Sequence, residues 1–77
     1  MPNATPEIWV NNNIAHMQGF TEEDHTILLY NALGEILLNT NFSGADFSLL
    51  LPELPTGIYV ISVMGAGSVY QQSVYVY

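Results

Sequence analysis

The stretch IYVISVM, residues 58–64, decides the fold of this chain. It consists mostly of β-branched and aromatic residues, and Tyr59, Ile61 and Val63 alternate on one face, as in a strand with one buried side. A glycine-containing turn then leads into a second apolar run, from Ser68 to Tyr77. Together the two runs predict a β-hairpin.

Similar short runs of Ile, Val, Leu and Tyr recur along the chain, each ended by Gly, Pro, Asn or Asp. No segment keeps apolar residues at helical spacing for more than about two turns. We therefore predict an all-β fold, an Ig-like antiparallel β-sandwich of about seven strands. The remaining predicted strands are residues 7–10, 14–18, 26–31, 35–39 and 46–51, with a loop at residues 40–45.

The size and composition fit a single packed domain. A chain of 77 residues is one domain, and a hydrophobic content of 49% with only 9% charged residues favours a core over disorder. We expect residues 1–6 to form a flexible leader and residues 7–77 to form the sandwich. The chain has no cysteine, so no disulfide supports the fold.

The charge balance limits the possible partners. The chain has seven acidic residues and neither Lys nor Arg, for a net charge of −7. A nucleic-acid partner is excluded, because binding phosphates requires cationic side chains, and an anionic membrane surface is disfavoured for the same reason. The acidic surface suits a basic partner or a bound cation. The sequence does not explain why Lys and Arg are missing.

Catalytic motifs are absent. The chain has no Gly-x-Ser-x-Gly turn and no thiol nucleophile, so we predict that it is not an enzyme and has no cofactor. The segment Glu22-Glu23-Asp24-His25 combines carboxylates with an imidazole on a predicted loop. A metal site needs further ligands at close spacing, so we expect a solvated acidic turn and predict no metal site. Whether the loop Glu22-Asp24 binds a cation stays open.

Aromatic side chains offer a second kind of site, since they can stack on sugar rings, although most are expected in the core or in cross-strand pairs. The last strand is a third candidate. Ser73-Val74-Tyr75-Val76-Tyr77 is uncharged and β-prone, so it is either an ordinary final strand or an edge that a partner binds. The aromatic candidates are Trp9, Tyr30, Tyr59, Tyr70, Tyr75 and Tyr77.

Two segments carry a family resemblance. The segment ILLYNALGEIL, residues 27–37, is similar to a hairpin of strand, Tyr-Asn, turn, Gly and strand, and FSLLLPELPTGIYVI, residues 47–61, resembles a Leu-x-x-Gly-Ile-Tyr block. In this order and spacing, the chain resembles the type A C-terminal sorting domain of proteins exported by the type IX secretion system of Bacteroidetes. The resemblance runs from about Ile8 to Tyr77.

The resemblance implies a function. Such domains fold in the periplasm and direct an N-terminal passenger through an outer-membrane translocon to the cell surface. A shuttle protein then delivers them to a sortase-like peptidase, which removes the domain. The domain is thus a recognised and cleaved address, not a catalyst. The sequence does not identify the passenger, the oligomeric state or whether the chain is a fragment.

The resemblance also assigns residues. Gly34 and Gly57 are expected where turns need positive φ or close backbone approach. Tyr59 is expected to enter the core with its hydroxyl bonded at the rim, and Leu54 to plug the core beside it. Partner recognition is expected at Leu54, Gly57, Tyr59, Ser73, Val74, Tyr75, Val76 and Tyr77.

Two other functions remain open at this point. The uncharged C-terminal strand is compatible with a structural or adhesive Ig-like module that self-assembles by edge-strand pairing. The aromatic residues are compatible with a carbohydrate-binding module led by Trp9. The chain also departs from the sorting-domain pattern, since Glu35 and a neutral final strand stand where basic residues are usual.

Overall fold

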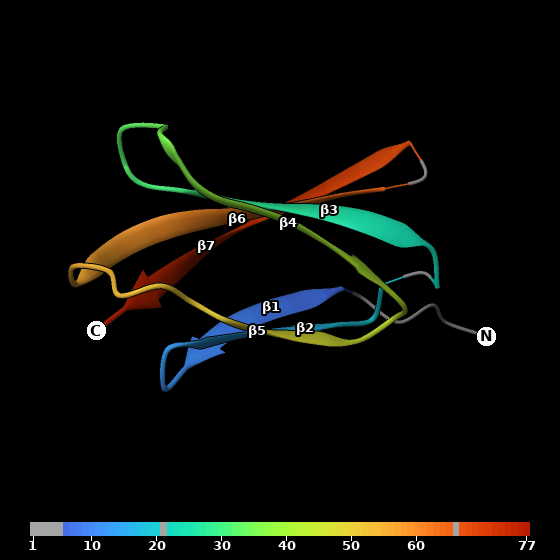
Figure 1. The fold of residues 1–77 in the computed structure, drawn as a ribbon, viewed down its shortest axis with the longest axis horizontal. Coiled ribbons are helices and arrows are strands. Elements are labelled where there is room, and N and C mark those ends of the chain that lie inside the picture. Colours follow the sequence, from blue (N-terminus) through green and yellow to red (C-terminus); the bar gives the residue numbers. More distant parts are fainter. Residues whose placement is uncertain (1–5, 21, 66) are drawn as a thin grey trace.

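The structure, a computed structural model, describes residues 6–20, 22–65 and 67–77, and these form a β-sandwich of two packed sheets (Figure 1). The described residues include no helix that is long and apolar enough to cross a membrane. The prediction of an all-β fold with seven strands is confirmed. The strands are β1 (Glu7–Asn11), β2 (Ile14–Gln18), β3 (Asp24–Tyr30), β4 (Ile36–Ser43), β5 (Phe47–Leu50), β6 (Gly57–Gly65) and β7 (Ser68–Val76).

The strand order is that of an Ig-like sandwich. One sheet has the order β1-β2-β5, and the other has the order β4-β3-β6-β7, with antiparallel pairing throughout. In an Ig constant-type domain the fourth strand joins the sheet of the first, second and fifth strands. Here the fourth strand pairs instead with the third, so β7 and β4 are the edges of the larger sheet.

The core lies between the sheets and follows the alternation of the strands. Inward positions of β6 and β3 supply its centre, where Ile27, Leu29 and Ile61 are fully buried. From the smaller sheet, Ala15 and Met17 of β2 close the core on the opposite side. Because every second residue of a strand points inward, one buried face of each sheet supplies the side chains of the core.

Two tight turns lie at the end of the sandwich where β1, β3 and β7 finish, here called the distal end (Figure 1). Asn12 and Asn13 join β1 to β2 with φ of 53° and 63°, the left-handed values that a two-residue hairpin requires. In the β3–β4 turn Gly34 has φ of 86°, and the Asn31 side chain accepts hydrogen bonds from the backbone N–H groups of Leu33 and Glu35. The positive φ of Gly34 matches the sequence prediction.

An aromatic cluster closes the opposite end, here called the proximal end. His25 is buried, with its ring 4.9 Å from that of Phe42 and 5.7 Å from that of Phe20. Phe42 also stacks on Phe47 at 4.6 Å. Gly65 lies directly against His25: a Cβ there would be 2.5 Å from Nδ1 of the imidazole, so this position admits no side chain without a shift.

The structure differs from the sequence prediction at two predicted loops. The loop predicted at residues 40–45 is wrong in its first part, because β4 continues to Ser43 through pairing with β3. Asp24 and His25 were expected on a loop, yet they begin β3, since Phe42 and Ser43 provide their partners. The predicted leader, residues 1–6, falls outside the described residues except for Pro6.

Candidate recognition site

The loop between β5 and β6, residues 51–56, is fixed at its first residue. Leu51 is buried, and its backbone N–H donates to the carbonyl oxygen of Asn13 at 3.0 Å. The side-chain amide of Asn13 donates in return to the carbonyl oxygen of Leu51, also at 3.0 Å. Because Asn13 belongs to the β1–β2 turn, these two bonds tie the loop to the smaller sheet.

Tyr59 fixes the other end of the loop. Its side chain is only 6% exposed, and its hydroxyl donates to the carbonyl oxygen of Pro55, four residues earlier, at 2.5 Å. A tyrosine near the start of the sixth strand that bonds to upstream backbone is the tyrosine corner of Ig-like sandwiches. Leu54, between the two fixed points, is half-buried and packs against the core. The structure agrees with the expected placement of both side chains.

Gly57 does not have the conformation that the sequence suggested. It is the first residue of β6 and is not among the glycines with positive φ. A Cβ there would meet only Cε1 of Tyr59, at 3.9 Å, which is an ordinary van der Waals distance. The expectation of positive φ or close approach is therefore correct for Gly34 and wrong for Gly57, because the turn is completed before the strand begins.

The last strand lies beside the start of β6. Their register pairs Gly57 with Val76, Ile58 with Tyr75 and Tyr59 with Val74. The predicted recognition residues of β7 therefore alternate between two environments. Val74 and Val76 are buried in the core, whereas Ser73 and Tyr75 are exposed on the outer face, and Tyr77, just after the strand, is 87% exposed.

Ile58, between the predicted recognition residues Gly57 and Tyr59, is a further exposed residue of this region. Ile58 is 60% exposed and faces outward opposite Tyr75, which is 52% exposed and stacks on Tyr77 at 5.4 Å. Ile58 faces outward because it precedes the inward Tyr59 in an alternating strand. Ile58, Tyr75 and Tyr77 together form an exposed apolar surface at the distal end, here called the distal patch.

A comparison with known protein families identifies the family of this chain. The family model of the secretion system C-terminal sorting domain matches residues 7–77, which include all seven strands. This chain belongs to that family. No curated protein matches the chain. The sorting domain is therefore a C-terminal sorting signal for type IX secretion, and its family is not a catalytic one.

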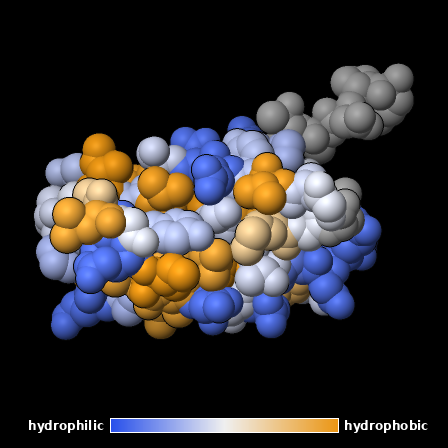
Figure 2. All heavy atoms as spheres, turned by 90° about the horizontal axis from the view of Figure 1, so that it is seen from above, coloured by the Kyte–Doolittle hydropathy of each residue, from blue (hydrophilic) through white to orange (hydrophobic). Residues whose placement is uncertain are grey.

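The outer face of the larger sheet gives the sorting domain a mixed surface. Hydrophobic side chains on this face lie in several separate groups with polar residues between them (Figure 2). Among its exposed apolar residues are Leu37 on β4, Ile58 on β6 and Val69 on β7. The distal patch is the place where such a residue adjoins two stacked tyrosines.

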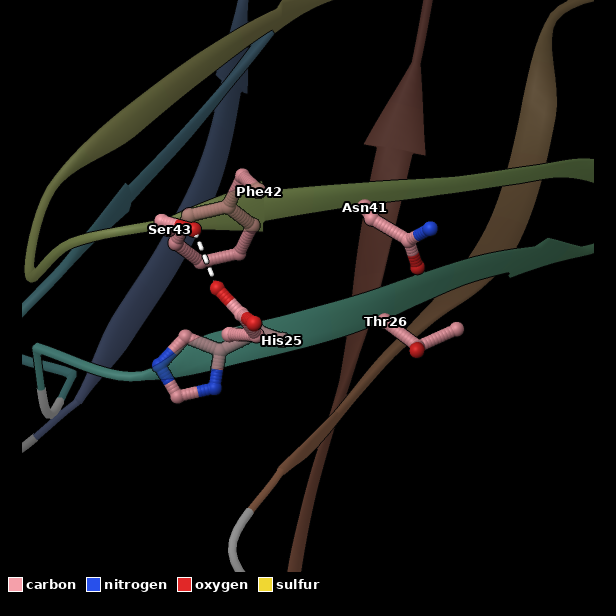
Figure 3. A pocket seen from close by; sticks show the side chains of 6 residues that line it. His25, Thr26, Asn41, Phe42 and Ser43 are labelled. Atoms are coloured by element: carbon pink, nitrogen blue, oxygen red, sulfur yellow. Dashed lines mark hydrogen bonds between the residues drawn. The ribbon is translucent and has the colours of Figure 1, made fainter.

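The segment considered for a metal lies at the proximal end and is divided between two sides of β3. Among the described residues no group of three or more His, Cys, Asp or Glu side chains is placed to hold a metal ion. His25 points inward against the ring of Phe42, whereas Ser43 donates to the carboxylate of Asp24 beside a hollow of about 450 Å³ (Figure 3). Thr26 and Asn41 line the rest of this hollow.

The aromatic residues of the sorting domain do not form one platform. Tyr59 is in the core, Tyr30 and Tyr70 are half-buried, and Trp9, Tyr75 and Tyr77 are exposed. Trp9 stacks on His16 of the neighbouring strand at 5.1 Å with an interplanar angle of 19°. This cross-strand pair is the usual arrangement for aromatic residues on a sheet surface. The described residues therefore form no continuous aromatic surface of the kind that the carbohydrate-binding alternative requires.

Proposed function

We propose that the type IX secretion machinery recognises this sorting domain at its distal end. The observation that carries the proposal is the register of β6 and β7, which brings the β5–β6 loop and the last strand side by side. The loop is held by the bonds of Asn13 and Tyr59, so a partner would meet it in one conformation. A preorganised surface costs less entropy to bind.

The eight residues expected to take part fall into two roles under this proposal. Ser73, Tyr75 and Tyr77 would contact the partner directly, together with Leu54, Gly57 and the exposed Ile58. Tyr59, Val74 and Val76 would act indirectly, because their buried side chains hold the loop and the strand in position. Exposed aromatic residues beside an aliphatic one are common anchors at protein interfaces.

The partners follow from the family. We propose that the domain is of type A and comes from a member of the Bacteroidetes, that it folds in the periplasm, and that it guides an N-terminal passenger through the outer-membrane translocon. A shuttle protein would then present it to a sortase-like peptidase, which removes it. β1 begins at Glu7, at the proximal end of the sandwich (Figure 1), so a passenger attached upstream of this strand would leave the distal end accessible.

The test is a secretion assay with surface variants. A fluorescent passenger carrying a signal peptide and residues 1–77 is expressed in a type IX-competent host, and its fluorescence outside the cell is measured. Deleting residues 73–77 is unsuitable because it removes the core residues Val74 and Val76. The double variant Tyr75→Ser with Tyr77→Ser alters only exposed side chains, and it should leave the passenger in the periplasm.

Val69→Ser is the matched control. Val69 is 62% exposed, on the same strand and the same face as Tyr75, but at the proximal end. This variant should be secreted like the wild type. Equal secretion of the double variant and the wild type would refute recognition at the distal patch, and periplasmic retention of the wild-type fusion would refute the sorting role in that host.

Self-assembly through β7 is a second candidate, supported by the composition of this edge strand. Charged residues and prolines usually protect an edge strand from pairing, and the nine residues of β7, Ser68–Val76, include neither. Each copy carries a net charge of −7, however, and has no Lys or Arg with which to form an ion pair between copies. Sedimentation of the purified chain over a range of concentrations tests the candidate, and a monomer at every concentration would rule it out.

A further inference from the structure

The two sheets leave an open seam on the side where β1 and β7 lie. Each of these strands has a hydrogen-bonded partner strand on one side among the described residues, β2 for β1 and β6 for β7. Their other edges approach each other without pairing. Backbone N–H and C=O groups along such an edge are available to a further strand.

Two hollows lie along this seam. One, of about 260 Å³, is lined by residues of β1, by the C-terminal part of β7 including Tyr75, and by Tyr77 just after the strand. The other, of about 510 Å³, lies nearer the proximal end and is lined by Glu7, Tyr70 and Gln72 among others. Trp9 borders both hollows. Alternating side chains of an added strand need receiving sites of this kind, spaced along the edge.

The edge of β7 lacks the features that usually prevent strand addition. It is nine residues long, has no charged residue or proline, and pairs with β6 without a register shift. The other edge strands are protected to a greater degree. β5 has only four residues, β1 begins with Glu7, and the pairing of β4 has an irregularity opposite Leu29 and Tyr30.

Charge decides what kind of strand fits. Glu7 is the charged residue that lines the seam, and the whole chain has a net charge of −7 without any Lys or Arg. A second copy would bring only further negative charge to the seam. A strand that carries Lys or Arg would instead meet an attractive field and could place its cation near Glu7.

We infer that the seam between β1 and β7 binds an extended segment of another protein, which adds as a strand to β7 and carries apolar side chains together with at least one Lys or Arg. Apolar side chains of this segment occupy the two hollows beside Trp9 and Tyr75. The inference deepens the proposed function, on which it rests only in taking the ligand to be a protein segment, and it adds β1 to the recognition surface.

The test is a peptide titration followed by NMR of the isotope-labelled chain. The probe is an acetylated nine-residue peptide in which Val and Thr alternate, with Lys at two of the outward positions. The control peptide has Glu in place of Lys. The Lys peptide should shift the amide signals of β1 and β7, and the Glu peptide should bind at least about tenfold more weakly. Equal binding of both peptides, or shifts confined to β4, would overturn the inference.

Variants of the chain separate the contributions of shape and charge. Trp9→Ala should weaken binding of the Lys peptide by about tenfold, as expected for loss of an aromatic anchor. Leu50 is an exposed residue on β5, and Leu50→Ala should leave this binding unchanged. Glu7→Gln should reduce the preference for Lys over Glu, and Glu53→Gln, which changes the net charge equally, should have a smaller effect. Signal changes on concentrating the chain alone would show that a second copy occupies the seam instead and would overturn the inference.

The secretion assay gives an independent result. If the Lys peptide does not bind while the wild-type fusion is still secreted, the seam inference alone is overturned. Loss of secretion by the wild-type fusion, with the peptide map intact, would overturn the sorting role and leave the seam as a binding surface.

Discussion

At the scale of the residue, the glycines show why the chemical type of a residue is not enough to assign its role. Gly34 has φ of 86°, a conformation in which a side chain clashes with the backbone. Gly65 has no room for a Cβ, since His25 Nδ1 would lie at 2.5 Å. Gly57 has neither constraint. The same residue type is therefore required for conformation, required for space, or free to change.

A substitution series at these glycines tests that distinction. Gly34→Ala should cost about 1–2 kcal/mol in the free energy of unfolding, because of the positive φ. Gly65→Ala should cost about 1–3 kcal/mol, because its methyl group overlaps the imidazole and the carbonyl oxygen of Asp24. Gly57→Ala should change stability by less than either. Urea unfolding monitored by tyrosine and tryptophan fluorescence measures all three, and a larger loss for Gly57→Ala than for Gly65→Ala would contradict the assignment.

The hydroxyl of Tyr59 provides a second test at this scale. Tyr59→Phe keeps the ring in the core but leaves the carbonyl oxygen of Pro55 without its donor. We expect a loss of about 1–2 kcal/mol in the free energy of unfolding, the usual cost of removing one partner from a partly buried hydrogen bond. Tyr75→Phe removes an exposed hydroxyl and is the matched control. Equal stability of the Tyr59→Phe variant and the wild type would show that the corner does not fix the loop.

At the scale of the element, the sequence predicted all seven strands, but it missed the end of β4, where apolar residues do not alternate. The stretch 58–64 was assigned correctly because Tyr59, Ile61 and Val63 all face inward. The end of β4 was assigned to a loop because Thr40, Asn41 and Ser43 are polar. These residues are nevertheless in a strand, since each pairs with a residue of β3. Tertiary pairing overrides weak local propensity.

The candidate site was only partly predictable for the same reason. The resemblance pointed to two segments, residues 54–59 and 73–77, but which of their side chains are exposed depends on the register between β6 and β7. That register separates Tyr75 from Val74 and Val76, and it adds Ile58 to the exposed set. The seam between β1 and β7 could not be predicted at all, since it arises where two sheets meet and no single segment encodes it.

Truncation of β7 tests how this element contributes to the whole sandwich. Removing residues 73–77 deletes two core residues and the partners of Gly57, Ile58, Tyr59 and Val60. Loss of one large buried aliphatic side chain typically costs about 2–5 kcal/mol, so the truncated chain should be largely unfolded. Removing Tyr77 alone should leave the urea midpoint nearly unchanged. Far-UV circular dichroism of both chains makes the comparison, and a cooperatively folded truncation at residue 72 would show that β7 is dispensable for the fold.

At the scale of the whole molecule, the absence of Lys and Arg has a consequence for proteolysis. A protease that cleaves after basic residues has no site anywhere in residues 1–77, folded or unfolded. Trypsin treatment of a passenger fusion should therefore release the sorting domain intact even in urea, as measured by mass spectrometry. Chymotrypsin, which cleaves after aromatic residues, should degrade it under the same conditions. Cleavage by trypsin within residues 1–77 would contradict the expectation.

The same charge imbalance determines how stability responds to salt. Seven carboxylates with no Lys or Arg repel one another across a small domain, and at low ionic strength the screening length of about 30 Å at 0.01 M reaches across it. Raising the salt to 0.15 M shortens this length to about 8 Å, so the repulsion weakens and the urea midpoint should rise. The double variant Glu22→Gln with Glu53→Gln, both at exposed positions, should be more stable than the wild type at low salt and should gain less from added salt. A midpoint that falls as salt is added would show that attractive interactions outweigh the repulsion among the carboxylates.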